Sequence, residues 1–270
     1  MSTGFEDRLR PITSRQNSLV KDLRKAFTHA ETTEDGYCAI EGVRIIEEAI
    51  RSGLRFKAVF VSESAQERAK KLLPQLAAQV ELLLVPDEVF QSAVPTETPQ
   101  GIAALVKLKS FDFKDVLRSD DALILAAAGL QDPGNLGTII RSAEAFGAAG
   151  VVLAEKTVSA YNPKVVRASA GSLFRLPVLK VPAADALATM RGRGMRILAT
   201  SSHKGVPLDE ADLTGGLAIF VGSEGAGVPK DIIGAADETI AIPQSPRVES
   251  LNAGIAASIV LYEAARQRRG

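Results

Sequence analysis

Residues 122–147 read ALILAAAGLQDPGNLGTIIRSAEAFG, and this stretch decides how the second half of the chain folds. The run 122–128 is apolar without alternation, which is typical of a strand buried on both faces of a parallel sheet. Residues 132–135 are turn-forming types, and the apolar spacing of residues 136–146 predicts a helix. A strand, a turn and a helix in this order form the repeating unit of an α/β fold.

The same alternation continues toward the C-terminus. Apolar runs predict further strands at 151–154, 196–200, 217–221 and 239–242, and helices at 163–170, 184–191 and 251–268. We therefore expect a Rossmann-like parallel sheet in this half of the chain. In the last helix, the spacing of Ile255, Ile259 and Tyr262 predicts that these three side chains face the core.

The first half of the chain predicts a smaller α/β unit. Helices are expected at 14–27 and 43–52, and strands at 37–40, 56–61, 82–85 and 102–108. The charged stretch 109–121 then separates the last of these strands from the apolar run at 122. We expect one domain over residues 1–110 and a second over residues 111–270.

Composition excludes several classes of protein. The chain has 270 residues with one cysteine and two histidines, so it cannot form an internal disulfide, and a zinc site is not expected. No run approaches the roughly 20 apolar residues of a membrane span, and the first residues lack an apolar secretory segment. We expect a cytoplasmic protein that binds neither metal nor membrane.

The net charge is zero, with 32 basic and 32 acidic residues, which does not exclude nucleic-acid binding because local patches matter more than the sum. Two basic segments stand out, residues 1–25 and 155–180. Solvated helix faces are the simpler explanation for such charge runs. If the segments bind RNA, the candidate contacts are Arg15, Lys21, Lys164, Arg167 and Arg175.

Arg141 is unusual in its predicted helix because it lies among apolar residues. A ligand in a parallel α/β fold binds at the carboxyl ends of the strands, where the preceding loop lies. Arg141 is therefore a candidate for chemistry at that edge. A purely structural role, with its stem on apolar surface or its charge paired with Glu144, is the alternative. Asn135 is expected to cap the same helix.

A glycine-rich loop follows the strand at 217–221. Its sequence, Gly222 to Gly227, does not match the G-x-G-x-x-G spacing of dinucleotide-binding loops, and Glu224 would repel a pyrophosphate. The loop suits a neutral or cationic ligand better, although a tight turn alone would also explain the glycines. Ser250 and Asn252 precede the last helix, where helix capping alone would account for both.

Taken together, three strings resemble the motifs of the SpoU (TrmH) class of the SPOUT methyltransferase superfamily. They are DPGNLGTIIRSAEAFG at 132–147, FVGSEGAGVP at 220–229 and IPQSPRVESLNAGIAASIVLYEA at 242–264. A fourth string, YNPKVVRASAGSLFRLPV at 161–178, is similar to the segment between the first two motifs. The strings SRQNSLVKDLRKAF, IEGVRIIEEAI and TPQGIAAL in the first half resemble more loosely an L30e-like RNA-binding domain.

The resemblance implies a C-terminal trefoil knot in the Rossmann-like domain, a homodimer, and transfer of a methyl group from S-adenosylmethionine to a ribose 2′-hydroxyl. The implied substrate is ribosomal RNA of the large subunit, with transfer RNA as an alternative. The residues that match the catalytic motifs are Asn135, Arg141, Glu224, Ser250 and Asn252. The residues whose backbone would hold the cofactor are Thr200, Gly222, Ile242 and Leu251.

Two features of the chain qualify this expectation. Gln244 stands where the family usually has methionine, and residues 245–247 replace a small glycine-containing turn. Both differences concern the RNA that is bound more than the cofactor. An inactive RNA-binding module and an NAD-dependent enzyme are the competing hypotheses. The complete catalytic set argues against the first, and the missing dinucleotide motif argues against the second.

Overall fold

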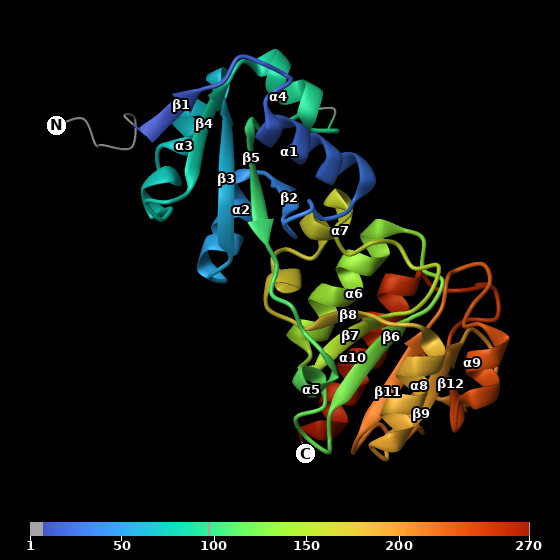
Figure 1. Ribbon diagram of the computed structural model, residues 1–270. Helices are drawn as coiled ribbons and strands as arrows, with labels where there is room; N and C mark the ends of the chain where they lie inside the picture. Colours follow the sequence, from blue (N-terminus) through green and yellow to red (C-terminus); the bar gives the residue numbers. More distant parts are fainter. Residues whose placement is uncertain (1–7, 97, 270) are drawn as a thin grey trace. The chain divides into compact units, whose positions relative to one another are not determined.

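The computed structural model describes residues 8–96 and 98–269, which fold into two compact units (Figure 1). Unit 1 contains residues up to 109 together with residues 161–174. Unit 2 contains residues 110–160 and 175 onward. A segment from the second half of the sequence therefore belongs to the first unit. The division expected at residue 110 places this segment in the second domain.

Unit 1 has a five-stranded mixed sheet in the order β1-β4-β3-β5-β2. The strands are β1 (Leu9–Pro11), β2 (Cys38–Glu41), β3 (Arg55–Ser62), β4 (Glu81–Val85) and β5 (Ile102–Lys107). β1, β4 and β3 run parallel, whereas β5 is antiparallel to both of its neighbours. The short strand β1, which ends in a proline at the edge of the sheet, was not predicted from the sequence.

Helices cover this sheet and close its core. They are α1 (Ser18–His29), α2 (Val43–Arg51), α3 (Gln66–Ala69), α4 (Asp87–Ala93) and α7 (Pro163–Ala168), with 3₁₀ turns at Glu63–Ala65, Leu73–Gln75 and Ser172–Phe174. Leu23 and Phe27 of α1 pack with Phe60 and Leu83 of the sheet. Asn17 caps α1 by accepting a hydrogen bond from Leu19 N.

Helix α7 lies beside β2 within unit 1 (Figure 1). The carboxylate of Glu41 is buried and accepts hydrogen bonds from Thr96 Oγ1 at 2.5 Å and Gln100 N at 2.8 Å. Arg167 of α7 supplies the positive charge, with Nη1 3.9 Å from Glu41 Oε2. A buried carboxylate without such partners would be costly, so this group ties the 161–174 segment to unit 1.

Unit 2 is built on a seven-stranded sheet in the order β10-β12-β9-β11-β6-β7-β8, and every pairing is parallel. The strands are β6 (Leu123–Ala127), β7 (Gly150–Leu153), β8 (Val178–Lys180), β9 (Arg196–Ser201), β10 (Val206–Pro207), β11 (Leu217–Val221) and β12 (Glu238–Ala241). The predicted parallel α/β sheet is confirmed. β8 and β10 were missed because they are only three and two residues long.

The helices of unit 2 lie on both faces of this sheet. They are α5 (Phe113–Val116), α6 (Pro133–Ala145), α8 (Ala183–Gly192), α9 (Lys230–Ala235) and α10 (Ala253–Arg268). Ile124 and Phe220 point to the face that packs with α8 and α9. The opposite face carries α6 and α10, which pack closely on each other (Figure 1). Their contact is so tight that a Cβ at Gly254 would lie 3.2 Å from Thr138 Cβ.

The prediction for the buried face of α10 was wrong. Ile255, Ile259 and Tyr262 are exposed, with 53%, 37% and 54% of their surface accessible. The buried residues of the helix are Ala253, Gly254, Ala257, Val260, Leu261, Ala264 and Ala265. Both stripes are apolar, so the pattern alone does not choose between them. The close approach of α6 selects the stripe with the smaller side chains.

No helix within residues 8–96 and 98–269 is long and apolar enough to span a bilayer. In the same residues, no group of three or more His, Cys, Asp or Glu side chains could hold a metal ion. Cys38 is buried in β2, and this burial raises the pKa of its thiol to about 12. The trefoil knot stays a prediction of the family resemblance.

Candidate active site

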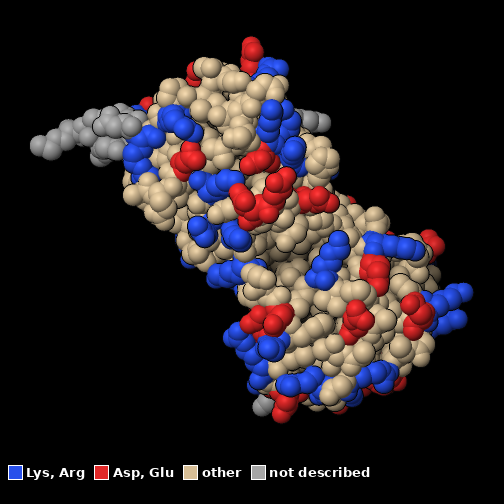
Figure 2. Space-filling model, viewed as in Figure 1, with Lys and Arg blue, Asp and Glu red and all other residues tan. Residues whose placement is uncertain are grey.

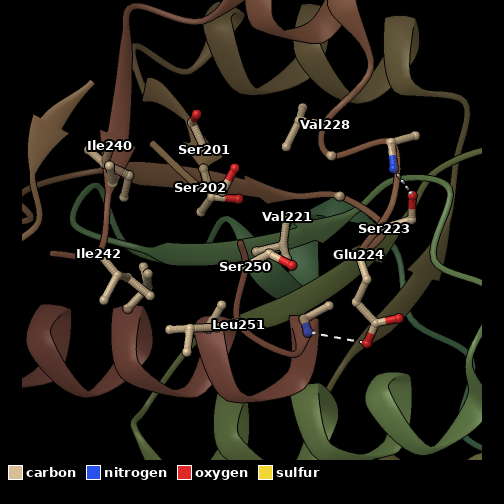
Figure 3. Close-up of a pocket in the computed structure, with 18 of the residues that line it drawn as sticks. Ser201, Ser202, Val221, Ser223, Glu224, Val228, Ile240, Ile242, Ser250 and Leu251 are labelled. Atoms are coloured by element: carbon tan, nitrogen blue, oxygen red, sulfur yellow. Dashed lines mark hydrogen bonds between the residues drawn. The ribbon is translucent and has the colours of Figure 1, made fainter. Parts of the chain in front are cut away.

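A pocket opens in unit 2 at the carboxyl ends of β9, β11 and β12 (Figure 3). Its volume is about 280 Å³, near the lower end of the roughly 300–1,000 Å³ that small-molecule sites occupy. The loops after these strands and the start of α10 form its walls. All four residues expected at the cofactor line it, namely Thr200, Gly222, Ile242 and Leu251.

The lining determines which ligands the pocket suits. Apolar side chains such as Leu208, Val228 and Ile240 form one part, and Ser201 and Ser202 add hydroxyl groups. Glu224 is the one charged residue of the described lining, which contains no Lys, Arg or His. A phosphate would find no cation here, whereas a positively charged ligand would find a carboxylate. This electrostatic pattern argues against NAD or a nucleoside triphosphate.

The glycine loop after β11 folds back on itself. Gly227 N donates a hydrogen bond of 2.8 Å to Ser223 O, and Gly227 has a φ of 66°, which favours glycine. A Cβ on Gly222 would lie 1.9 Å from Gly227 C, so no other residue fits there without moving the loop. The tight turn and the ligand site are therefore one structure, because the turn presents Glu224 beside the pocket.

Three side chains from distant parts of the chain meet at the edge of this pocket. Asn135 Nδ2 donates a short hydrogen bond to Glu224 Oε1. Asn252 Nδ2 lies 2.8 Å from Asn135 Oδ1 and 3.0 Å from Glu224 Oε1. Ala253 N lies 3.4 Å from the same Glu224 oxygen (Figure 3). The structure thus brings together one residue from each of the three sequence motifs.

Asn135 reaches the cluster because another residue caps its helix. The sequence predicts Asn135 as the cap, but Asp132 holds that position and accepts a hydrogen bond of 2.7 Å from Asn135 N. Asn135 therefore lies inside the first turn of α6, where its amide is buried and aimed at Glu224. This correction makes Asp132 part of the site's framework.

Asn252 serves both as a helix cap and as part of the polar cluster, the two roles that the sequence leaves open. Its Oδ1 caps α10 by accepting a hydrogen bond of 3.1 Å from Ile255 N. Its Nδ2 holds Asn135 and Glu224. Ser250 lines the pocket (Figure 3), but its hydroxyl makes no hydrogen bond to the described residues.

Glu224 has one constrained oxygen and one open oxygen. Oε1 accepts hydrogen bonds from Asn135, Asn252 and Ala253 N, whereas Oε2 makes none with the described residues. The carboxylate is thereby fixed in orientation with a free acceptor. Such an acceptor can receive a hydrogen bond from a ligand without the residue having to reorient.

Arg141 lies two turns further along α6 and is exposed. It makes no hydrogen bond or ion pair with any described residue. The expected structural alternative, a pair with Glu144, is not formed because Arg175 binds Glu144 with two hydrogen bonds of 2.7 and 2.9 Å. Arg141 therefore presents an uncommitted guanidinium on the surface of unit 2.

The candidate RNA contacts differ in availability. Arg167 and Arg175 are paired with Glu41 and Glu144, and Arg15 lies 3.6 Å from Glu88. Lys21 and Lys164 are exposed and have no ion pair with the described residues. Basic and acidic side chains are interspersed on the visible surface (Figure 2). The basic segment 155–180 is also divided, because its residues 161–174 belong to unit 1.

Two polar residues contribute to the site in ways that the sequence interpretation did not predict. Asp132 was assigned only to a turn, although an Asp directly before a proline at the start of a helix is a capping signal. Gln244 lines the pocket, and its Nε2 donates a hydrogen bond of 2.8 Å to Ser202 O. No sequence pattern indicated that contact, which joins the loops after β9 and β12.

Comparison with known proteins identifies both parts of the chain. The SpoU rRNA Methylase family matches residues 122–262, and an MRM3-like substrate binding domain matches residues 17–104. The 23S rRNA (guanosine(2553)-2′-O)-methyltransferase RlmP of Bacillus subtilis is 32% identical over 94% of this chain and 98% of its own length. The 23S rRNA (uridine(2479)-2′-O)-methyltransferase of Streptomyces viridochromogenes is 31% identical over 96% and 93%.

Solved structures agree with this match. The SpoU methyltransferase AviRb from Streptomyces viridochromogenes, in complex with the cofactor AdoMet, has a TM-score of 0.82 at 28% identity over 94% of this chain and 99% of its own. The AdoMet-bound rRNA methyltransferase from Sinorhizobium meliloti also has a TM-score of 0.82, at 28% identity over 96% and 98%. With its sequence motifs, its parallel sheet and these similarities, the chain belongs to the SpoU rRNA methylase family.

Proposed function

We propose that the protein transfers a methyl group from S-adenosylmethionine to a ribose 2′-hydroxyl of large-subunit ribosomal RNA. One observation carries this proposal. The pocket at the carboxyl edge of the parallel sheet adjoins the cluster of Asn135, Glu224 and Asn252, which unites all three family motifs. The relatives that are named as 23S rRNA 2′-O-methyltransferases match nearly the whole length of this chain.

The charge of the pocket and the residues that line it suit S-adenosylmethionine. S-adenosylmethionine supplies, when bound, a methyl group on a positively charged sulfonium sulfur. Thr200, Gly222, Ile242 and Leu251 would hold it through the loops that they belong to. The carboxylate of Glu224, with no basic residue in the described lining, favours such a cation.

We assign the chemical roles according to what each residue can do. Arg141 offers five N–H donors and no acceptor atom, so it does not act as a base. It therefore stabilises the developing 2′-alkoxide and binds the adjacent phosphate, while the hydroxyl proton passes to water or phosphate. Glu224 uses its open oxygen to orient the ribose or a guanidinium, and Asn135 and Asn252 fix its other oxygen. Ser250 offers a free hydroxyl to the substrate.

Unit 1 is proposed as the part that binds RNA, with the 161–174 segment included in it. Lys21 and Lys164 are its uncommitted cations among the candidate contacts, and Arg15 is paired only on the surface. Phosphate contacts of this kind give an affinity that falls as salt is added. An rRNA substrate also fits a cytoplasmic location.

The finer proposal for assembly is a homodimer. The exposed apolar stripe of Ile255, Ile259 and Tyr262 runs along α10, and Tyr262 stacks edge-on against Phe146 at 5.7 Å. Contiguous apolar side chains of this size on a surface mark an interaction site. A second copy of the chain would bury the stripe against itself about a two-fold axis.

The experiment that tests the function uses methyl-labelled S-adenosylmethionine with unmodified 23S rRNA and transfer-RNA transcripts. After incubation, the RNA is digested to nucleosides and the labelled nucleoside is identified. We expect a 2′-O-methyl nucleoside from 23S rRNA. Label on a base would contradict the reaction, and label in transfer RNA alone would replace the substrate. Cofactor binding without transfer to either RNA would favour an inactive binding module.

A further inference from the structure

The side chain of Gln244 contains a polar atom whose lack of a hydrogen-bond partner needs an explanation. It lies in the loop between β12 and α10 and lines the pocket. Its Nε2 donates a hydrogen bond of 2.8 Å to Ser202 O. Its Oε1 is buried and has no hydrogen-bond partner, and no other buried side-chain nitrogen or oxygen within residues 8–96 and 98–269 lacks one.

The orientation of this amide is fixed by its surroundings. If the amide were rotated by half a turn, Oε1 would face the carbonyl oxygen of Ser202, and two acceptors would meet. The observed orientation is therefore the only one that makes the bond to Ser202. It leaves Oε1 without a donor, and a buried acceptor without a donor costs stability. Each such atom in a native fold calls for an explanation.

We propose that Gln244 Oε1 accepts a hydrogen bond from S-adenosylmethionine and so positions the cofactor. This inference rests on the proposed function. The cofactor carries several donors, namely an adenine amino group, a ribose diol and an ammonium group. The lining offers the apolar surface and hydroxyls that surround such groups, and Gln244 supplies an acceptor that has no other use.

Gln244 also connects two loops of the pocket. Its bond to Ser202 ties the loop after β9 to the loop after β12, and both loops line the pocket. With the cofactor bound, the residue would make one bond to the protein and one to the cofactor at the same time.

The test measures cofactor affinity and stability on the same variants. Gln244→Met keeps the length of the side chain and removes both the acceptor and the donor to Ser202 O. We expect its dissociation constant for S-adenosylmethionine, from calorimetric titration, to rise about three- to tenfold, the usual effect of one lost hydrogen bond. Its melting temperature without cofactor should change little, because loss of the bond to Ser202 O is offset by removal of an unsatisfied buried acceptor.

A control variant separates this role from a structural one. Gln267→Met is the matched control, because Gln267 is fully bonded to Ala211 O and Leu213 N outside the pocket. It should lower the melting temperature and leave the affinity unchanged.

The outcomes distinguish this inference from the proposed function. If the wild-type protein does not bind S-adenosylmethionine, the proposed function fails. If the wild type binds and Gln244→Met binds equally well, only the role of Gln244 is overturned. A fall in the melting temperature of Gln244→Met together with unchanged affinity would show that Gln244 merely holds the loops.

Discussion

At the scale of single residues, the site depends on side chains that use their two polar atoms for different purposes. Asn252 caps α10 with its oxygen and holds Glu224 and Asn135 with its nitrogen. The sequence predicted the cap, since Asn is a common capping residue. It could not show that the same amide faces two residues more than 20 positions away, because that contact exists only after the sheet has formed.

Substitution of Asn252 should separate these two purposes. In Asn252→Asp the capping oxygen remains, but the donor is lost and a second carboxylate lies beside Glu224. We expect methyl transfer to fall by at least tenfold, because Glu224 loses its fixed orientation. Asn252→Ala should lose transfer as well and also unfold about 1 kcal/mol more easily, the usual cost of a lost cap. Transfer assays and urea unfolding check both effects.

Equal activity of Asn252→Asp and the wild type would contradict this role. The control is Asp112→Asn, which changes the cap of α5, a residue that accepts a hydrogen bond from Lys114 N and lies outside the candidate site and the proposed RNA contacts. That variant should keep wild-type transfer, since an asparagine caps a helix as well as an aspartate does.

At the scale of elements, helix α10 shows what periodicity can and cannot predict. The helix itself was expected at 251–268 and is observed at Ala253–Arg268. Its buried face was not predicted, because apolar residues occupy two stripes. Packing decides, since Gly254 and the alanines allow α6 to approach, and the hydroxyls of Ser142 and Ser258 meet at 2.7 Å across the contact.

The exposed stripe of α10 predicts the assembly. Ile259→Glu places a charge in the centre of the stripe without disturbing the buried face. We expect the dimer to dissociate to a monomer, because a buried unpaired charge is costly at an apolar interface. Light scattering after size exclusion measures the mass. Ala78→Glu, which adds the same charge at an exposed position of unit 1, should leave the dimer intact.

A monomeric wild-type protein at micromolar concentration would contradict the proposed dimer. A monomer of Ile259→Glu with an unchanged circular dichroism spectrum would confirm that the stripe joins two copies and does not support the fold.

At the scale of the whole molecule, the two compact units are not two consecutive stretches of the chain. The charged stretch 109–121 indicated a boundary, and the structure starts unit 2 at Ser110. The sequence did not indicate that residues 161–174 fold with unit 1. That assignment depends on Arg167 meeting the buried Glu41 and on Gly171 lying against Glu48, contacts between residues more than 100 positions apart.

The site was more predictable than its surroundings because family motifs carry it. The four residues expected at the cofactor line one pocket, and Asn135, Glu224 and Asn252 meet at its edge. Arg141 lies apart from this cluster and has no partner among the described residues. We propose that the RNA substrate supplies its partner, a contact that cannot be inferred from the sequence of one chain.

The central claim is that this pocket and its polar cluster perform methyl transfer with Arg141 acting on the RNA. The most direct test compares the wild type with Arg141→Ala in single-turnover transfer to 23S rRNA, with cofactor affinity measured on the same samples. We predict that transfer falls at least a hundredfold, in line with the loss of one charge-stabilising group, while the affinity for S-adenosylmethionine stays within about twofold. Wild-type transfer by Arg141→Ala would contradict the account.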